Sequence, residues 1–215
     1  MPLILPGNVG SATAATEIVS NSARFNAGSS DYLSKAFGTG NRKTWTFSTW
    51  IKLGGVGDAD NYRIFSSYTD NTTSFYIGFD HNRYYIYGES GNTVFAEYIG
   101  TSELRDPSAW YHLVYAFDTT QGTAANRFKI YRNNVLETLT VDHAVGQDEE
   151  LELNRDGKTH YIGQQGSSGA YFSGYLAETV FIDGAALAPT SFGEFDSDSG
   201  IWKPIDVSGL TFGTN

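Results

Sequence analysis

The 215-residue sequence contains no cysteine. Disulfides, thiolate zinc sites, iron–sulfur clusters and cysteine nucleophiles are therefore excluded together. Long hydrophobic runs are also missing, because the longest, such as Leu3–Leu5, fall far short of the ~20 residues of a membrane-spanning helix. A secretory signal would begin with basic residues followed by an apolar stretch of about 7–15 residues, and the sequence has no such pattern. We expect no membrane insertion, and stability must come from packing.

Basic residues are scarce as well. The 14 Lys and Arg stand against 24 Asp and Glu, which gives a formal net charge of -10 and a pI near 4.7. Such a charge repels phosphate backbones and anionic lipids, so nucleic acid is not an expected partner. The carboxylates are scattered, which favours a role in solubility, with calcium binding as the alternative.

What the sequence has in abundance is glycine, tyrosine and phenylalanine, at 24, 14 and 14 residues, a composition typical of short strands joined by tight turns. Apolar and polar residues alternate with a period of two in several segments. The clearest are Thr44–Leu53, Ser74–Asp80, Arg83–Tyr87, Trp110–Asp118, Arg127–Arg132 and Tyr171–Ile182. Further expected strands are Ser22–Phe25, Arg63–Ser67, Thr93–Ile99, Val135–Val141 and His160–Ile162.

Ten or more short strands without a helix-period segment predict an all-β, antiparallel two-sheet sandwich. Each strand should bury one face. In Ser74–Asp80 this places Phe75, Ile77 and Phe79 in the core and Tyr76 on the outer surface. The pair Asn133-Asn134 tolerates positive φ and predicts a two-residue hairpin turn.

The two ends of the sequence are less regular than its middle. Residues 1–15 are small and weakly patterned, as in an arm or linker, and residues 16–190 form the expected sandwich. Residues 191–215 are predicted to be a C-terminal extension that leaves the sandwich. The sequence ends on Gly213-Thr214-Asn215 without structural punctuation, which indicates a fragment of a longer chain.

Four stretches, in order, resemble the laminin-G/pentraxin type of concanavalin A-like domain. They are Thr46–Leu53 (TFSTWIKL), Trp110–Asp118 (WYHLVYAFD), Lys129–Glu137 (KIYRNNVLE) and Phe172–Leu187 (FSGYLAETVFIDGAAL). The resemblance implies a jelly roll of two curved sheets. Domains of this superfamily often bind calcium through loop oxygens at one sheet edge. The resemblance therefore implies calcium as a candidate cofactor.

A narrower likeness concerns Asn41–Thr46, Phe181–Pro204 and Phe212–Asn215, which together resemble LamG-domain virion proteins of marine bacteriophages. It implies a tail-fibre, receptor-binding or capsid-attached protein, located on the virion and made in the host cytoplasm. The expected function is non-catalytic recognition of a host-surface carbohydrate. The alternative is a decoration or attachment domain that binds other virion proteins, and a homo-oligomer is expected in either case.

A polysaccharide hydrolase is the third hypothesis. A retaining glucanase needs two carboxylates about 5–5.5 Å apart. The nearest pair, Glu150 and Glu152 within Asp148–Glu152, lacks the Glu-x-Asp-x-Glu pattern with neighbouring tryptophans and is typical of a solvated acidic turn. We expect no enzyme.

Carbohydrate binding would use aromatic rings against sugar C–H groups, with polar side chains for the hydroxyls. The candidate residues are Trp50, Tyr76, Tyr85, Tyr87 and His112, which lie opposite the aliphatic face of their strands or beside a turn. The competing explanation for the rings is packing in the core or at an interface between subunits. For His112 a structural, half-buried role comes first and hydrogen bonding to a sugar second.

Calcium prefers six to eight oxygen ligands. The candidate ligands are aspartates of three short, oxygen-rich loops: Asp58, Asp60, Asp70, Asp196 and Asp198. Aspartate is also an ordinary turn residue, so turn formation is the alternative for each loop.

Overall fold

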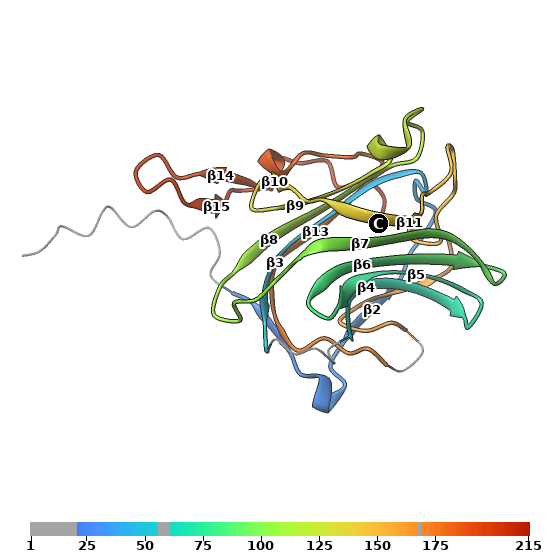
Figure 1. Cartoon of the computed structure of the whole chain (residues 1–215), viewed down its shortest axis with the longest axis horizontal. Coiled ribbons are helices and arrows are strands. Elements are labelled where there is room, and N and C mark those ends of the chain that lie inside the picture. The colour runs from blue at the N-terminus through green and yellow to red at the C-terminus, as the bar shows by residue number, and fades with distance from the viewer. Residues whose placement is uncertain (1–20, 56–60, 167–168) are drawn as a thin grey trace, which may run out of the picture.

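The computed structural model describes residues 21–55, 61–166 and 169–215, and it is all-β. Two large antiparallel sheets lie face to face and a short hairpin projects beyond one end of them (Figure 1). The predicted two-sheet jelly-roll sandwich is confirmed. None of the described helices is long and apolar enough to span a membrane.

The elements are as follows. The six-stranded sheet contains, in spatial order, β1 (Ala23–Phe25), β13 (Gly174–Asp183), β3 (Thr44–Leu53), β8 (Tyr111–Asp118), β9 (Phe128–Arg132) and β10 (Val135–Leu136). The seven-stranded sheet contains β11 (Leu139–His143), β7 (Thr93–Glu103), β6 (Arg83–Ser90), β5 (Thr73–Asp80), β4 (Asn61–Asp70), β12 (Thr159–Ile162) and β2 (Leu33–Ala36). The hairpin pairs β14 (Gly193–Phe195) with β15 (Trp202–Pro204), and the 3₁₀ helices are η1 (Ala27–Ser29), η2 (Ala124–Asn126) and η3 (Pro189–Ser191).

The core consists mainly of aromatic rings that meet between the sheets. Phe47 of β3 stacks on Phe65 of β4 at 4.7 Å between ring centroids, and Trp45 meets Phe75 of β5 edge to face at 6.0 Å. The side chains predicted to point inward from β5 are fully buried. Each buried aromatic side chain removes a large apolar area from water, so these contacts hold the two sheets together.

All the predicted strands exist, but one of them is divided. Val135–Val141 was expected to be continuous, whereas β10 belongs to the six-stranded sheet and β11 to the seven-stranded sheet. The chain crosses between the sheets at Glu137, whose carboxylate pairs with Arg132 at 2.9 Å. Asn133 and Asn134 have φ of 47° and 69°, as the predicted hairpin turn requires.

Strand β2 and the hairpin β14–β15 were not predicted. All four residues of β2 are exposed, so its sequence lacks the alternation that marks a half-buried strand. It is the last strand of its sheet and pairs only with β12.

The C-terminal residues do not leave the sandwich, contrary to the expectation. Phe192 packs with Val114 and Val180 on the outer face of the six-stranded sheet, and Asn215 donates a hydrogen bond to the carbonyl oxygen of Gly38 at 3.2 Å. Within the C-terminal residues, the β14–β15 hairpin is the part that extends past the sheets (Figure 1). The sequence pattern missed this packing because the cluster joins residues that are far apart in the chain.

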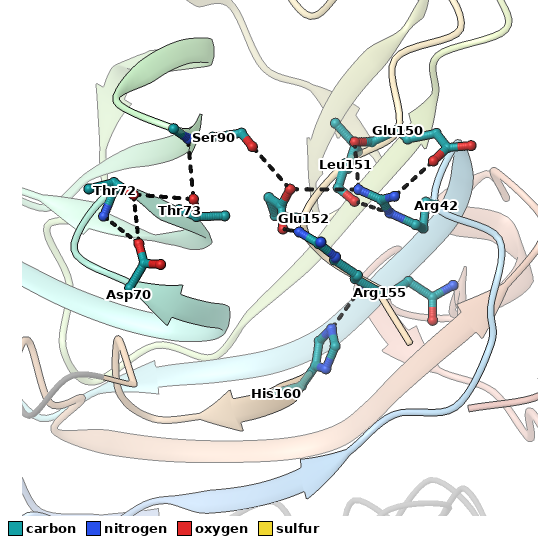
Figure 2. A network of polar contacts seen from close by, with 12 residues as sticks. Arg42, Asp70, Thr72, Thr73, Ser90, Glu150, Leu151, Glu152, Arg155 and His160 are labelled. Atoms are coloured by element: carbon teal, nitrogen blue, oxygen red, sulfur yellow. Dashed lines mark hydrogen bonds and ion pairs between the residues drawn. The ribbon is translucent and has the colours of Figure 1, made fainter. Parts of the chain in front are cut away.

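A polar network fixes the loop before β12 (Figure 2). Glu152 is 4% exposed and pairs with Arg155 at 2.6 Å and with Arg42 at 3.7 Å, while Ser90 of β6 approaches it at 3.4 Å. Glu150 is largely exposed and pairs with Arg42 at 2.7 Å. The expectation of a solvated acidic turn therefore holds for Glu150 but not for Glu152, and arginines neutralise both carboxylates.

We expect Glu152→Gln to lower the free energy of unfolding by about 1–3 kcal/mol, because two arginines lose a buried anion. Arg155 is partly exposed and can turn to water, which keeps the loss below that of a fully buried pair. Glu150→Gln is the matched control and should change the free energy of unfolding by less than about 0.5 kcal/mol. Urea unfolding of both variants checks this, and equal losses would contradict it.

Candidate functional site

Three of the predicted ligand-binding residues meet on the outer face of the seven-stranded sheet. Tyr76 of β5 lies opposite Tyr87 of β6. Tyr85 lies two residues before Tyr87 on β6 and therefore points to the same outer face. The rings of Tyr76 and Tyr87 are 5.3 Å apart with planes 21° from parallel, and Tyr85 lies 6.2 Å from Tyr87 and 5.9 Å from Tyr76. Tyr85 and Tyr87 are half-buried. Tyr76 is only 7% exposed, less open than the sequence indicated.

An arginine completes this cluster and covers Tyr76. The guanidinium carbon of Arg63 lies 4.2 Å from the ring centroid of Tyr76 and 5.5 Å from that of Tyr85. One of its terminal nitrogens donates to the carbonyl oxygens of Tyr62 and Phe79 at 3.2 and 3.1 Å. We call Arg63, Tyr76, Tyr85 and Tyr87 the tyrosine face.

Glycine at position 78 makes room for the arginine. Arg63, Gly78 and Tyr85 form one cross-strand row, so the missing side chain leaves a gap between the other two. A Cβ added at Gly78 would lie 1.9 Å from the carbonyl oxygen of Tyr62. The bulged strand β4 can approach β5 this closely only where the partner has no side chain.

Two carboxylates border the rings. Tyr85 donates a hydrogen bond to Glu97 of β7 at 2.9 Å, and Tyr87 donates one to Glu89 of β6 at 3.1 Å. Burial and the bond to Glu89 raise the pKa of Tyr87 to about 12, and burial raises the pKa of Tyr85 further. Both hydroxyls therefore stay protonated at neutral pH and can donate hydrogen bonds.

We expect Gly78→Ala to lower the free energy of unfolding by about 1–3 kcal/mol, as overpacking does. The added methyl group meets backbone and must displace β4, which carries Arg63 away from Tyr76. Gly122→Ala, whose Cβ would meet open space, is the control and should have little effect. Thermal unfolding together with near-ultraviolet circular dichroism of the tyrosines tests this, and an unchanged spectrum would refute it.

The other two predicted residues, Trp50 and His112, lie on the opposite side of the molecule. They stack on each other at 5.0 Å on the outer face of the six-stranded sheet. His112 is 1% exposed, since the C-terminal segment covers it. Trp202 donates to its Nδ1 at 3.0 Å, and Nε2 lies 2.9 Å from the hydroxyl oxygen of Ser48. Both ring nitrogens are in use, so His112 fits the structural role and not hydrogen bonding to a sugar.

Two buried histidines should make stability depend on pH. Burial lowers the pKa of His112 and of His160 to about 4, against about 6.5 in the unfolded chain. Below pH 6.5 only the unfolded chain takes up the protons, so the free energy of unfolding should fall between pH 6.5 and pH 4. The loss is about 3 kcal/mol for each histidine.

Urea unfolding across this pH range measures the effect. We expect His112→Gln to remove about half of the dependence, although the variant is less stable throughout. The exposed His143 provides the control, because His143→Gln should leave the slope as in the natural sequence. A slope that His112→Gln does not reduce would contradict the assignment.

The candidate calcium ligands are not brought together. Asp70 is the last residue of β4, where it accepts hydrogen bonds from Thr72, and Asp196 lies in the β14–β15 hairpin. Asp196 accepts a hydrogen bond from Lys203 at 3.1 Å, and hydrogen bonds, those from Ser199 first, hold its pKa well below its usual range. Within the described ranges no three His, Asp or Glu side chains form a metal-binding group.

Asp198 lies two residues after Asp196 in the same hairpin and donates its backbone N–H to that carboxylate at 3.1 Å. Asp58 and Asp60 lie outside the described residues. Calcium binding by these loops stays a prediction.

Comparison with known proteins places this architecture in a family. The Laminin_G_3 model, described as concanavalin A-like lectin/glucanases superfamily, matches residues 26–190. The match spans more than half of the chain, and the chain belongs to this superfamily. A search of curated proteins finds no significant match.

Solved structures share the fold at low sequence identity. Domain 4 of AbnA, a GH43 extracellular arabinanase from Geobacillus stearothermophilus solved in complex with arabinotriose, has a TM-score of 0.53 and 18% identity, over 74% of this chain and 69% of that one. The LG1-3 region of the laminin α2 chain has a TM-score of 0.55 and 10% identity, over 75% of this chain and 31% of that one. Mouse laminin α1 domains LG4-5 have a TM-score of 0.54 and 12% identity, over 89% and 46%.

Sequence reasoning missed three residues around the tyrosines: Arg63, Glu89 and Glu97. Arg63 lies within a predicted strand, but the cross-strand register that brings it beside Tyr85 is not visible in one sequence. The glutamates alternate with inward-facing residues on β6 and β7, and this period-2 pattern could have placed them on the outer face.

Proposed function

We propose that this domain is a non-catalytic carbohydrate-binding module and that the tyrosine face is its binding surface. The observation that carries the proposal is the contact among Tyr76, Tyr85 and Tyr87, which come from two strands and stack on the outer face of one sheet. Membership of a lectin/glucanase superfamily supports it, as does the shared fold of a domain solved with arabinotriose.

The chemistry of the surface suits a sugar. Half-buried rings offer apolar area to the C–H groups of a pyranose, and the adjacent carboxylates accept hydrogen bonds from its hydroxyls. Arg63 fixes the ring of Tyr76 from one side, so little side-chain entropy is lost on binding. On the opposite sheet, the C-terminal segment covers His112, and Trp50 is half-buried and stacks on that histidine.

A hydrolytic role has less support. The carboxylates of Glu150 and Glu152 pair with arginines, and their segment lacks the Glu-x-Asp-x-Glu pattern of a retaining glucanase. The virion location, the glycan of a host surface and the homo-oligomeric state stay predictions from the sequence resemblance. So does the alternative of an attachment domain for other virion proteins.

Binding can be tested by isothermal titration and thermal unfolding of the chain with a panel of bacterial surface polysaccharides, with EDTA or millimolar calcium. A ligand that binds only the native state raises the unfolding temperature. We expect Tyr85→Ala and Tyr87→Ala each to weaken binding roughly fivefold to tenfold, since each removes about 1 kcal/mol of ring contact.

Phe195→Ala, which removes an exposed ring on the hairpin, is the matched control and should bind as the natural sequence does. Equal weakening by all three variants would argue against the tyrosine face. If no polysaccharide bound to the folded chain, the attachment role would be favoured instead. Release of reducing ends from any polysaccharide would contradict the non-catalytic assignment.

A further inference from the structure

We infer that the tyrosine face selects neutral glycans and rejects carboxylated or sulfated ones. This inference rests on the proposed function and names the ligand class. It follows from the charges around the rings: the cation of the face is buried, whereas its two glutamates are partly exposed.

The cation is Arg63, which is 7% exposed. Its guanidinium group is held against Tyr76 and Tyr85, and the carbonyl oxygens of Tyr62 and Phe79 accept its hydrogen bonds. Recognition of an acidic sugar uses a guanidinium that can present two N–H groups to the anion. Arg63 instead donates from one terminal nitrogen to backbone carbonyl groups, and its Nε is buried without a hydrogen-bond partner among the described residues, so the side chain orders the face without presenting two N–H groups to a ligand.

The anions are Glu89 and Glu97. Each uses one carboxylate oxygen to accept the hydroxyl of its tyrosine. Among the described residues, neither carboxylate forms an ion pair, and the second oxygen of each has no hydrogen-bond donor. A sugar hydroxyl can donate to this oxygen in a charge-assisted hydrogen bond, whereas a ligand carboxylate or sulfate meets like charge.

The next charges along the sheet do not reverse this balance. Arg83 lies two residues before Tyr85 on the same strand, but both of its cross-strand partners are acidic, Asp80 on β5 and Glu103 on β7. The whole chain carries a formal charge of -10, which adds repulsion at long range.

Ligand pairs that share one backbone and differ in charge test the inference directly. Suitable pairs are galactan with sulfated galactan, and methyl-esterified with free oligogalacturonate. We expect titration calorimetry at 20 and 200 mM NaCl to show that, at low salt, the charged member of each pair binds at least tenfold more weakly than the neutral member. The difference should narrow at high salt, because screening weakens repulsion between exposed charges.

The double variant Glu89→Gln/Glu97→Gln should reduce this difference at least threefold. The control Glu149→Gln/Glu194→Gln changes the net charge by the same amount, but away from the tyrosine face. It should leave the affinity difference between the two ligands unchanged. Equal or tighter binding of the charged member would overturn the inference, as would a preference that the Glu89→Gln/Glu97→Gln variant leaves undiminished.

Failure of the proposed function gives a different result. If the natural sequence binds neither member of any pair, or if Tyr85→Ala leaves neutral binding intact, the tyrosine face is not the site and this inference falls with it. A tyrosine-dependent interaction that prefers charged glycans would instead retain the proposed function and overturn only the selectivity.

Discussion

The aromatic contact between the two sheets sets the register on which the rest of the molecule depends. Phe47 and Phe65 stack across the interior, and Phe75 lies against Trp45. A shift of β5 by one residue would move its whole apolar set to solvent. Because the core fixes this strand, Tyr76 must point outward. The composition of the outer face is thus a consequence of how the inner face packs.

The period-2 alternation of apolar and polar residues therefore predicts much of the fold and part of the candidate site. It identified the strands and placed the three tyrosines on an outer surface, which is where they lie. It also placed Trp50 opposite the core, and this too is its position. A period-2 pattern reports which side of a strand a residue faces, but it does not report what covers that side.

What covers each outer face depends on contacts between distant residues. His112 accepts a hydrogen bond from Trp202, 90 residues later in the chain, and no local pattern encodes that pairing. The gap at Gly78 is similar, since its role requires knowledge that Arg63 lies opposite. Sequence reasoning therefore found the rings of the candidate site but not the arginine that packs on two of them. The missing step was the register between strands.

The two outer faces differ in the chemistry of their side chains. Under the C-terminal segment lie Val114, Val180 and Ile182, which gain stability from being covered. The tyrosine face carries Glu89 and Glu97, which form no ion pair among the described residues, and covering it with protein would bury both carboxylates at a large energetic cost. This face therefore has a physical reason to stay open to solvent. A hydrated, hydroxyl-rich ligand can contact it without removing those charges from hydrogen-bond partners.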